Sequence, residues 1–127
     1  MMGDVYTVRF GRELDGIWFT ANSRLDRWEK ARRVKQARQL SWAKFHACPK
    51  YGKATLTVTV ISRTGRRFDM LNPADIVKPL IDGAIDAGIL PDDDVKHLPS
   101  ATFIGEKQKG GRGKPGHEII ITFTETD

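Results

Sequence analysis

The region from Asp69 to Asp94 concentrates side chains that could act on a phosphate ester. It contains seven aspartates and one lysine, Lys78, and Asn72 lies among them. Carboxylate oxygens are ligands that suit Mg²⁺ and Mn²⁺, and a lysine ammonium can neutralise charge that develops on a phosphate. These residue types could therefore support metal-assisted hydrolysis of a phosphodiester.

A purely structural explanation of the same region is also well motivated. In FDMLNPADIVKP, residues 68–79, Asn-Pro followed by Asp is ordinary helix-initiation chemistry. Lys78 could pair with Asp75 or Asp82 on its own helix, which is the preferred interpretation if the lysine is taken alone. Asp92 to Asp94 could cap a turn, and Asn72 is suited to shaping a loop. The residues by themselves leave both explanations open.

Positive charge is concentrated in a different segment. Residues 24–44 contain eight Lys or Arg and two acids, a local charge of +6 in a chain whose total is +5, so the remainder sums to −1. A basic segment beside an acidic one suggests a polyanion held next to a metal site, whereas a solvated surface helix is the alternative. The cations expected to contact phosphates are Arg24, Arg27, Arg32, Arg33, Lys35, Arg38, Arg66, Arg67, Lys109, Arg112 and Lys114.

Hydrophobic periodicity predicts the strands that must position these residues. VYTVRF at 5–10 alternates, and GIWFTA at 16–21 is expected to extend it or pair with it. The clearest alternation is in ATLTVTVISR at 54–63, and this strand or its extension should deliver Asp69 to its end. Two more strands are predicted at 100–107 and 117–125. The Gly-rich basic connector between them should be mobile and exposed to solvent.

A long first helix is predicted over residues 24–47, which lack Gly and Pro and are rich in good helix formers. Asn22 or Ser23 is the expected N-cap. The apolar residues, Trp28 and Trp42 among them, fall on one broad side but share it with cations. We therefore expect this helix to pack along only part of its length, with its tryptophans in the core or at a dimer interface.

A second, amphipathic helix is predicted to end at Ala87, with Gly88 just beyond it. Pro79 is tolerated best in a first turn, so the helix should begin near Asp75, a plausible N-cap. One side would carry the apolar residues Ile76, Val77, Leu80, Ile81, Ala84 and Ala87, and the polar side would carry Asp75, Lys78, Asp82 and Asp86.

Length and composition bound the class of protein. A chain of 127 residues with 39% hydrophobic residues predicts one domain, and the order of elements predicts an α+β fold with a small mixed sheet of about four to five strands and two main helices. No segment resembles a membrane span or a signal peptide, so we expect a soluble cytoplasmic protein. Cys48 is the only cysteine and cannot form an internal disulfide.

The segment RRFDMLNPADIVKPLIDGAIDAGILPDDD, residues 66–94, resembles the central signature of RusA-type Holliday junction resolvases, a family common in phages and prophages. In that signature an Asp-x-Asp-Asn group precedes a lysine, an aspartate and a paired aspartate. FTANSRLDRWEKARRVKQAR at 19–38 is similar to the family's N-terminal Asn-x-Arg segment and basic helix. The last two strands around a Gly-rich basic loop also fit, so the likeness extends over most of the chain.

The resemblance implies a homodimeric, magnesium-dependent endonuclease that binds four-way DNA junctions and nicks opposing strands. By position, it implies catalytic roles for Asp69, Lys78 and Asp93, and supporting roles for Asn72 and Asp82. The expected metal ligands are Asp69, Asp75, Asp92 and Asp93. Asp75 is included because Leu71 stands where the family has its second aspartate, and two additional residues follow Asn72.

Two other functions stay open. Leu71 motivates a resolvase-like protein with weakened cleavage that acts as a DNA-binding or protein-binding module. A nucleic-acid-binding domain unrelated to nucleases would explain the basic helix but would leave the acidic cluster unused.

Overall fold

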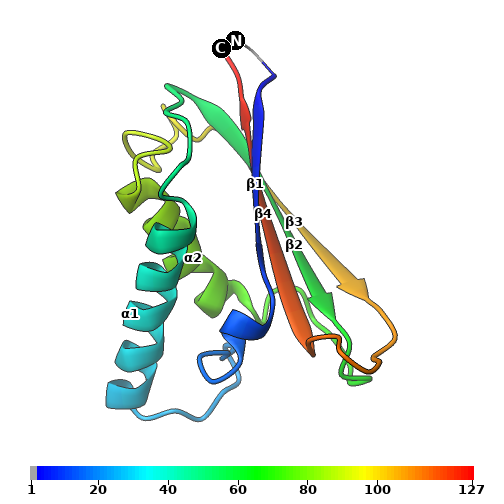
Figure 1. The fold of residues 1–127 in the computed structure, drawn as a ribbon. Coiled ribbons are helices and arrows are strands. Elements are labelled where there is room, and N and C mark those ends of the chain that lie inside the picture. Colours follow the sequence, from blue (N-terminus) through cyan, green and yellow to red (C-terminus); the bar gives the residue numbers. More distant parts are fainter. Residues whose placement is uncertain (1–2) are drawn as a thin grey trace.

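One four-stranded mixed sheet supports both main helices, which lie on the same side of it (Figure 1). The computed structural model describes residues 3–127. The strand order is β1-β4-β2-β3, in which β4 pairs antiparallel with β1 and β2, whereas β2 and β3 are parallel. The elements are β1 (Val5–Phe10), a 3₁₀ turn η1 (Arg12–Leu14), α1 (Arg27–Lys44), β2 (Ala54–Ser62), α2 (Ala74–Asp86), β3 (Ala101–Lys107) and β4 (His117–Glu125). The predicted α+β class is confirmed.

The two central strands show why the sheet is covered on one face only. Val58 on β2 lies opposite Ile121 on β4, and both are fully buried. The neighbouring pair, Thr57 and Thr122, is partly exposed. Because successive side chains in a strand point to opposite faces, this alternation gives one apolar face and one threonine-rich face.

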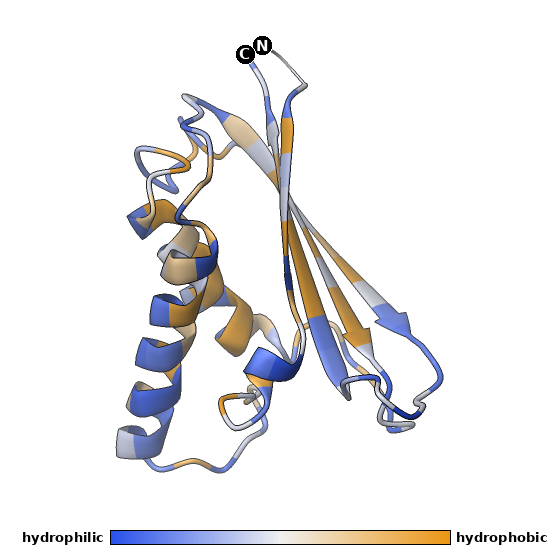
Figure 2. Ribbon diagram, viewed as in Figure 1, coloured by the Kyte–Doolittle hydropathy of each residue, from blue (hydrophilic) through white to orange (hydrophobic). Residues whose placement is uncertain are grey.

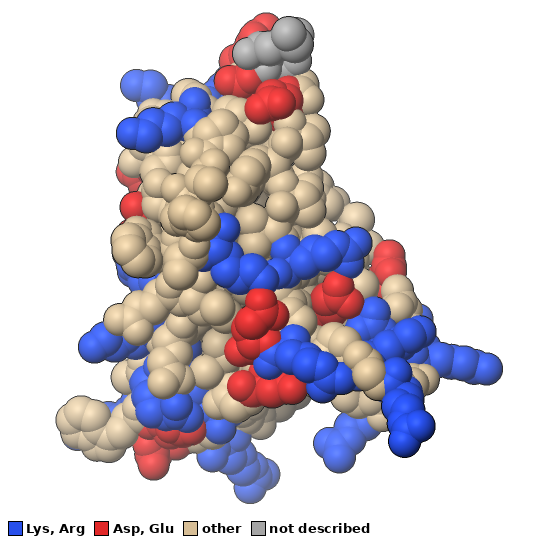
Figure 3. Space-filling model, in the orientation of Figure 1, with Lys and Arg blue, Asp and Glu red and all other residues tan. Residues whose placement is uncertain are grey.

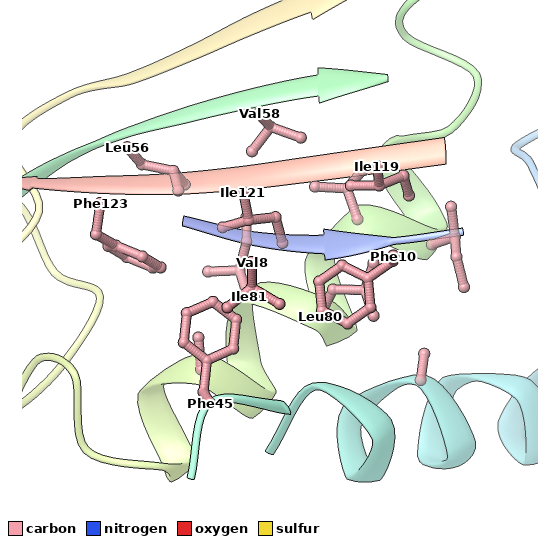
Figure 4. Close-up of a cluster of buried hydrophobic side chains, with 14 of the residues drawn as sticks. Val8, Phe10, Phe45, Leu56, Val58, Leu80, Ile81, Ile119, Ile121 and Phe123 are labelled. Atoms are coloured by element: carbon pink, nitrogen blue, oxygen red, sulfur yellow. The ribbon is translucent and has the colours of Figure 1, made fainter. Parts of the chain in front are cut away.

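Helix α2 supplies the apolar layer that covers the sheet. Its buried residues include Leu80 and Ile81, which lie beside Phe10 and Val8 of β1 and Phe45 at the end of α1 in the core (Figure 4). Figure 2 shows the contrast between the apolar character of α2 and the hydrophilic surface of α1. Each fully buried aliphatic or aromatic side chain stabilises the fold by roughly 1.5–3 kcal/mol. The apolar side predicted for this helix is confirmed.

Helix α1 contacts α2 through small residues. Ala37 and Ser41 are its buried positions, and Ser41 Oγ donates a hydrogen bond of 2.5 Å to the Leu80 carbonyl oxygen. Trp28 and Trp42 are 73% and 55% exposed, so they do not lie in the core; their placement at a dimer interface stays a prediction. A close helix crossing leaves no room for indole rings at the contact.

The N-terminal boundaries differ from the sequence prediction. No strand forms at 16–21, because η1 and the turns after it lead the chain away from β1. Helix α1 begins later than expected, with Asp26 as its N-cap and the Glu29 N–H donating to the cap at 2.8 Å. Ser23 Oγ instead accepts from the Thr20 N–H at 2.9 Å, so it shapes the preceding turn rather than the helix start.

The start of α2 also requires a correction. Pro73 is the N-cap and Ala74 the first helical residue, so Asp75 lies within the first turn instead of capping it. Pro79 lies inside the helix, where it cannot donate to the carbonyl four residues earlier. Its side chain is buried, so packing offsets this single lost hydrogen bond. Within residues 3–127, no helix has both the length and the apolar character needed to cross a bilayer.

Candidate functional site

The polar side of α2 holds a lysine between two carboxylates. Lys78 Nζ donates to Asp82 Oδ1 and to Asp93 Oδ2, each at 2.8 Å. Asp82 lies one turn further along α2, and Asp93 comes from the loop that follows the helix. Two of the three predicted catalytic residues, Lys78 and Asp93, are therefore in direct contact, and the Lys78 side chain is still 60% exposed. The predicted supporting residue Asp82 belongs to the same cluster.

The charges in this cluster reinforce one another. Hydrogen bonds to Asp82 and then to Asp93 raise the pKa of Lys78, and the hydrogen bond from Lys78 holds the pKa of Asp93 below its usual value. At neutral pH the cluster is thus an ammonium flanked by two carboxylates. Such a lysine is suited to donate hydrogen bonds to an anion and unsuited to act as a general base. The ion pair between Lys78 and Asp82 is the one that the structural explanation of the sequence predicted. The hydrogen bond from Lys78 to Asp93 goes beyond that explanation.

Asp69 lies in a different place, on the loop between β2 and α2. The strand ends at Ser62, so of the two expected routes to Asp69, the strand or its extension, β2 itself is excluded and the segment after it carries this aspartate. The loop packs against β3 on both sides of Asp69: a Cβ added at Gly105 would lie 3.0 Å from Phe68 Cε2 and 3.3 Å from Met70 Sδ. Asp69 Oδ1 accepts from the Leu71 N–H at 3.1 Å, which closes an Asx turn.

This loop forms one side of a cleft of about 530 Å³. The other side comes from residues after η1 and from the first residue of β4, where Trp18 and His117 stack with ring centroids 3.9 Å apart and planes 10° from parallel. The Ala21 N–H donates to the Asn72 carbonyl at 2.9 Å and joins the two sides. The lining residues are Trp18, Thr20, Asn22, Ser23, Ser62, Thr64, Arg66, Arg67, Phe68, Asp69, Asn72, Pro73 and His117.

Sequence reasoning did not identify the stacked pair. Trp18 fell in a segment predicted as a strand, and His117 is the first residue of β4. Their contact depends on the path of the chain after η1, for which periodicity carries no signal. Asn72, predicted as a supporting residue, does line the cleft together with Asp69.

The four predicted metal ligands do not form a ready-made metal site. Asp75 faces Lys30, with Oδ2 3.6 Å from Nζ, and Asp92 Oδ1 accepts from the Asp93 N–H at 2.7 Å. Asp69 lies in the cleft. Throughout residues 3–127, no group of three or more His, Cys, Asp or Glu side chains could together hold an ion. The arrangement therefore does not fit a bound divalent cation as it stands.

Several cations predicted to contact DNA are engaged within the protein. Arg38 makes two hydrogen bonds to Asp86, of 2.5 and 2.9 Å, across the two helices. Arg32 binds Glu29 through two nitrogens, and Arg33, only 23% exposed, binds Glu29 and the Trp18 carbonyl. These three arginines thus have structural contacts that a DNA phosphate would have to displace.

Other predicted cations are free to bind an anion. Figure 3 shows basic side chains gathered at the end of the sheet where β2 and β3 end and β4 begins. Arg63 holds the β3–β4 connector there by binding Gln108, the Pro115 carbonyl and Glu118. The connector is exposed as predicted. Cations with no ion pair among the described residues are Arg24, Arg27, Lys35, Arg66, Arg67, Lys109, Arg112 and Lys114.

Comparisons with known proteins add no functional assignment. No protein-family model matches the chain, and no curated protein matches it. Solved structures that resemble it include the hydrogenase maturation protein HypE, at 13% identity over 100% of this chain and 33% of that chain, with a TM-score of 0.35. HypE in complex with ATP and HypE from E. coli give 11% and 10% identity at the same TM-score. This chain spans about a third of those chains, and likeness at this level carries no argument about fold or function.

Proposed function

We propose that this protein is an endonuclease that binds four-way DNA junctions as a homodimer and resolves them by paired nicks. The observation that carries the proposal is the cluster in which Lys78 contacts Asp82 and Asp93. Asp93 lies beyond the end of α2, yet it joins Lys78 and Asp82, two other residues of the signature on which the resemblance to RusA-type resolvases rests. An ion pair serving the helix alone would need only Asp82.

Lys78 would stabilise the negative charge that develops on the scissile phosphate. The Lys78 side chain is 60% exposed, and the two carboxylates fix the position of its ammonium and keep it protonated. A positioned donor that meets charge developing in the transition state accelerates a reaction by roughly 10²–10³. Lys78 would keep its proton while it donates hydrogen bonds to the phosphate oxygens.

The resemblance also implies a requirement for Mg²⁺, with Mn²⁺ as the alternative. Within residues 3–127 the carboxylates are not arranged as a ligand set, so the roles proposed for this chain's own residues do not depend on a metal ion. A divalent cation would supply an activated water and neutralise a leaving oxygen. Cleavage assayed with and without added Mg²⁺ or Mn²⁺ tests this requirement.

The basic end of the sheet would provide the DNA-binding surface. Arg66 and Arg67 lie on the loop that carries Asp69, and Lys109, Arg112 and Lys114 lie on the neighbouring connector. Contacts from such cations to phosphates would position the DNA without reading its sequence. We propose this surface as the main contact with DNA in place of the central part of α1, because the arginines there are engaged in internal ion pairs.

A second function is favoured by a specific observation. Leu71 cannot ligate a metal, and no group of three possible ligands converges within residues 3–127. The same fold could therefore bind branched DNA and cleave it slowly or not at all, as a DNA-binding or protein-binding module.

The deciding experiment incubates the protein with an end-labelled four-way junction, with and without Mg²⁺ or Mn²⁺. Symmetric nicks in opposing strands that require the metal would support the endonuclease. Binding without nicks under all conditions would support the second function. Light scattering at micromolar concentration should give about twice 14.3 kDa, since paired nicks require two active sites; a fully active monomer would contradict the paired mechanism.

A further inference from the structure

The cleft beside Asp69 has two chemically different sides. One side is the stacked pair of Trp18 and His117. Burial lowers the pKa of His117, so its ring is uncharged at neutral pH. The other side is polar, with Asn72 and Asp69 from the β2–α2 loop. Aromatic rings and hydrogen-bonding groups that line the same cleft are the combination that recognises a planar, polar ring.

Two cations add a preference for anions. Arg66 and Arg67 both line the cleft and are exposed, and neither has a carboxylate partner in the described chain. The other arginine near this end of the sheet, Arg63, is neutralised by Glu118 at 3.0 Å. A ligand with a ring and an adjacent phosphate would therefore satisfy both the aromatic pair and the two free guanidinium groups.

The size of the cleft limits what can enter. Its volume of about 530 Å³ lies within the range of roughly 300–1,000 Å³ typical of sites for single small ligands. A DNA duplex is far too wide, and its bases are inaccessible while they are stacked and paired. A base can reach such a cleft only after leaving the helix, and this costs least where pairing is already lost.

From these observations we infer that the cleft lined by Trp18, His117, Arg66 and Arg67 binds one unpaired nucleotide of a DNA strand, its base against the aromatic pair and its phosphate on the arginines. This inference rests on the proposed function, because it takes DNA as the ligand. It adds a recognition step: a branch point would be held by a base that has lost its pairing partner as well as by its phosphates.

The test measures binding to three matched DNA duplexes by fluorescence anisotropy in EDTA, so that no cleavage occurs. One duplex has a single unpaired nucleotide, the second has an abasic site at the same bulge, and the third is fully paired. The base-containing bulge should bind on the order of 10-fold tighter than the abasic bulge. Equal affinity of the wild-type protein for these two bulges would overturn the inference without any variant being needed.

Variants assign the effect to the cleft. Trp18→Ala and, separately, His117→Ala should bring the ratio of the two bulge affinities close to 1, with circular dichroism verifying the fold. Trp42→Ala is the matched control, because Trp42 is an exposed tryptophan on α1 that does not line this cleft, and the ratio should persist. Persistence of the ratio in both cleft variants would overturn the inference.

The outcomes separate this inference from the proposed function. Failure to bind any of the three duplexes would overturn the inference, whereas the endonuclease would still be decided by the four-way junction assay. Equal binding of all three duplexes would overturn the inference but would not contradict the proposed endonuclease activity, which the cleavage assay tests. Tighter binding of the same bulge in RNA would overturn the assignment to DNA.

Discussion

Replacing Gly83 with alanine should separate the two helices and lower the stability of the fold. A Cβ at this position would lie 2.3 Å from the Arg38 carbonyl oxygen, 2.7 Å from Ser41 Cβ and 2.9 Å from the Trp42 nitrogen. Two of these neighbours are backbone atoms of α1, which cannot rotate away. The helix must therefore move, and the hydrogen bond from Ser41 to the Leu80 carbonyl must stretch.

The size of the effect follows from two opposing contributions. Overpacking typically costs about 1–3 kcal/mol, and contact with backbone atoms favours the upper end. Alanine gains about 1 kcal/mol over glycine in helix propensity. The net expectation for Gly83→Ala is a destabilisation of about 2 kcal/mol, which for a chain of this length lowers the Tm by roughly 6–8 °C.

Thermal unfolding followed by circular dichroism measures this directly. Gly52→Ala is the control, because a Cβ there would meet nothing within 4 Å, and its Tm should stay the same or rise slightly. If Gly83→Ala leaves the Tm unchanged or raises it, the close crossing of α1 and α2 is refuted.

Three further predictions concern charge. The double variant Arg66→Ala/Arg67→Ala should reduce the slope of log affinity for DNA against log salt concentration by about 2, because two phosphate contacts are lost. Arg33→Ala is the matched control: it removes a mostly buried structural contact, so it should lower the Tm and leave that slope unchanged. Burial opposes ionisation of Glu13, but hydrogen bonds, first that from Lys44, lower its pKa to about 2, below the ordinary 4.5. The stability this group contributes is complete above pH 4.5 and is lost as pH falls towards 2, so Glu13→Gln should flatten the urea-unfolding stability between those values; an unaltered pH profile would contradict the pairing. Lys78→Gln should change the free energy of unfolding by less than about 1 kcal/mol, because the lysine side chain is 60% exposed. The same variant should slow junction cleavage by on the order of 100-fold or more. Loss of stability without loss of cleavage would make the cluster purely structural.

The sequence predicted the elements whose periodicity is strong. The alternation through Leu56, Val58 and Val60 identified β2, and the apolar side of α2 was correct because that helix buries a full stripe. Trp28 and Trp42 lie outside the core because the packed side of α1 is defined by small residues, which hydropathy does not distinguish.

The candidate site was predictable only in part. The i,i+4 spacing of Lys78 and Asp82 specifies their contact once a helix is assigned, whereas the resemblance assigned Asp93 to the same signature without predicting its contact with Lys78. The stack of Trp18 on His117 could not be foreseen, because two residues distant in sequence meet only when the loops around β4 take their final paths. The catalytic roles of Asp69, Lys78 and Asp93 stay predictions.

The most direct test of the proposed endonuclease compares the wild-type protein with Asp93→Asn on a labelled four-way junction, with binding and single-turnover cleavage measured in the same samples. Asn keeps the size of the side chain but removes the charge that faces Lys78. Junction binding should stay within about threefold because Asp93 offers no phosphate contact, whereas Mg²⁺-dependent cleavage should fall at least about 100-fold. Full cleavage by Asp93→Asn, or no cleavage by the wild-type protein, would contradict the account.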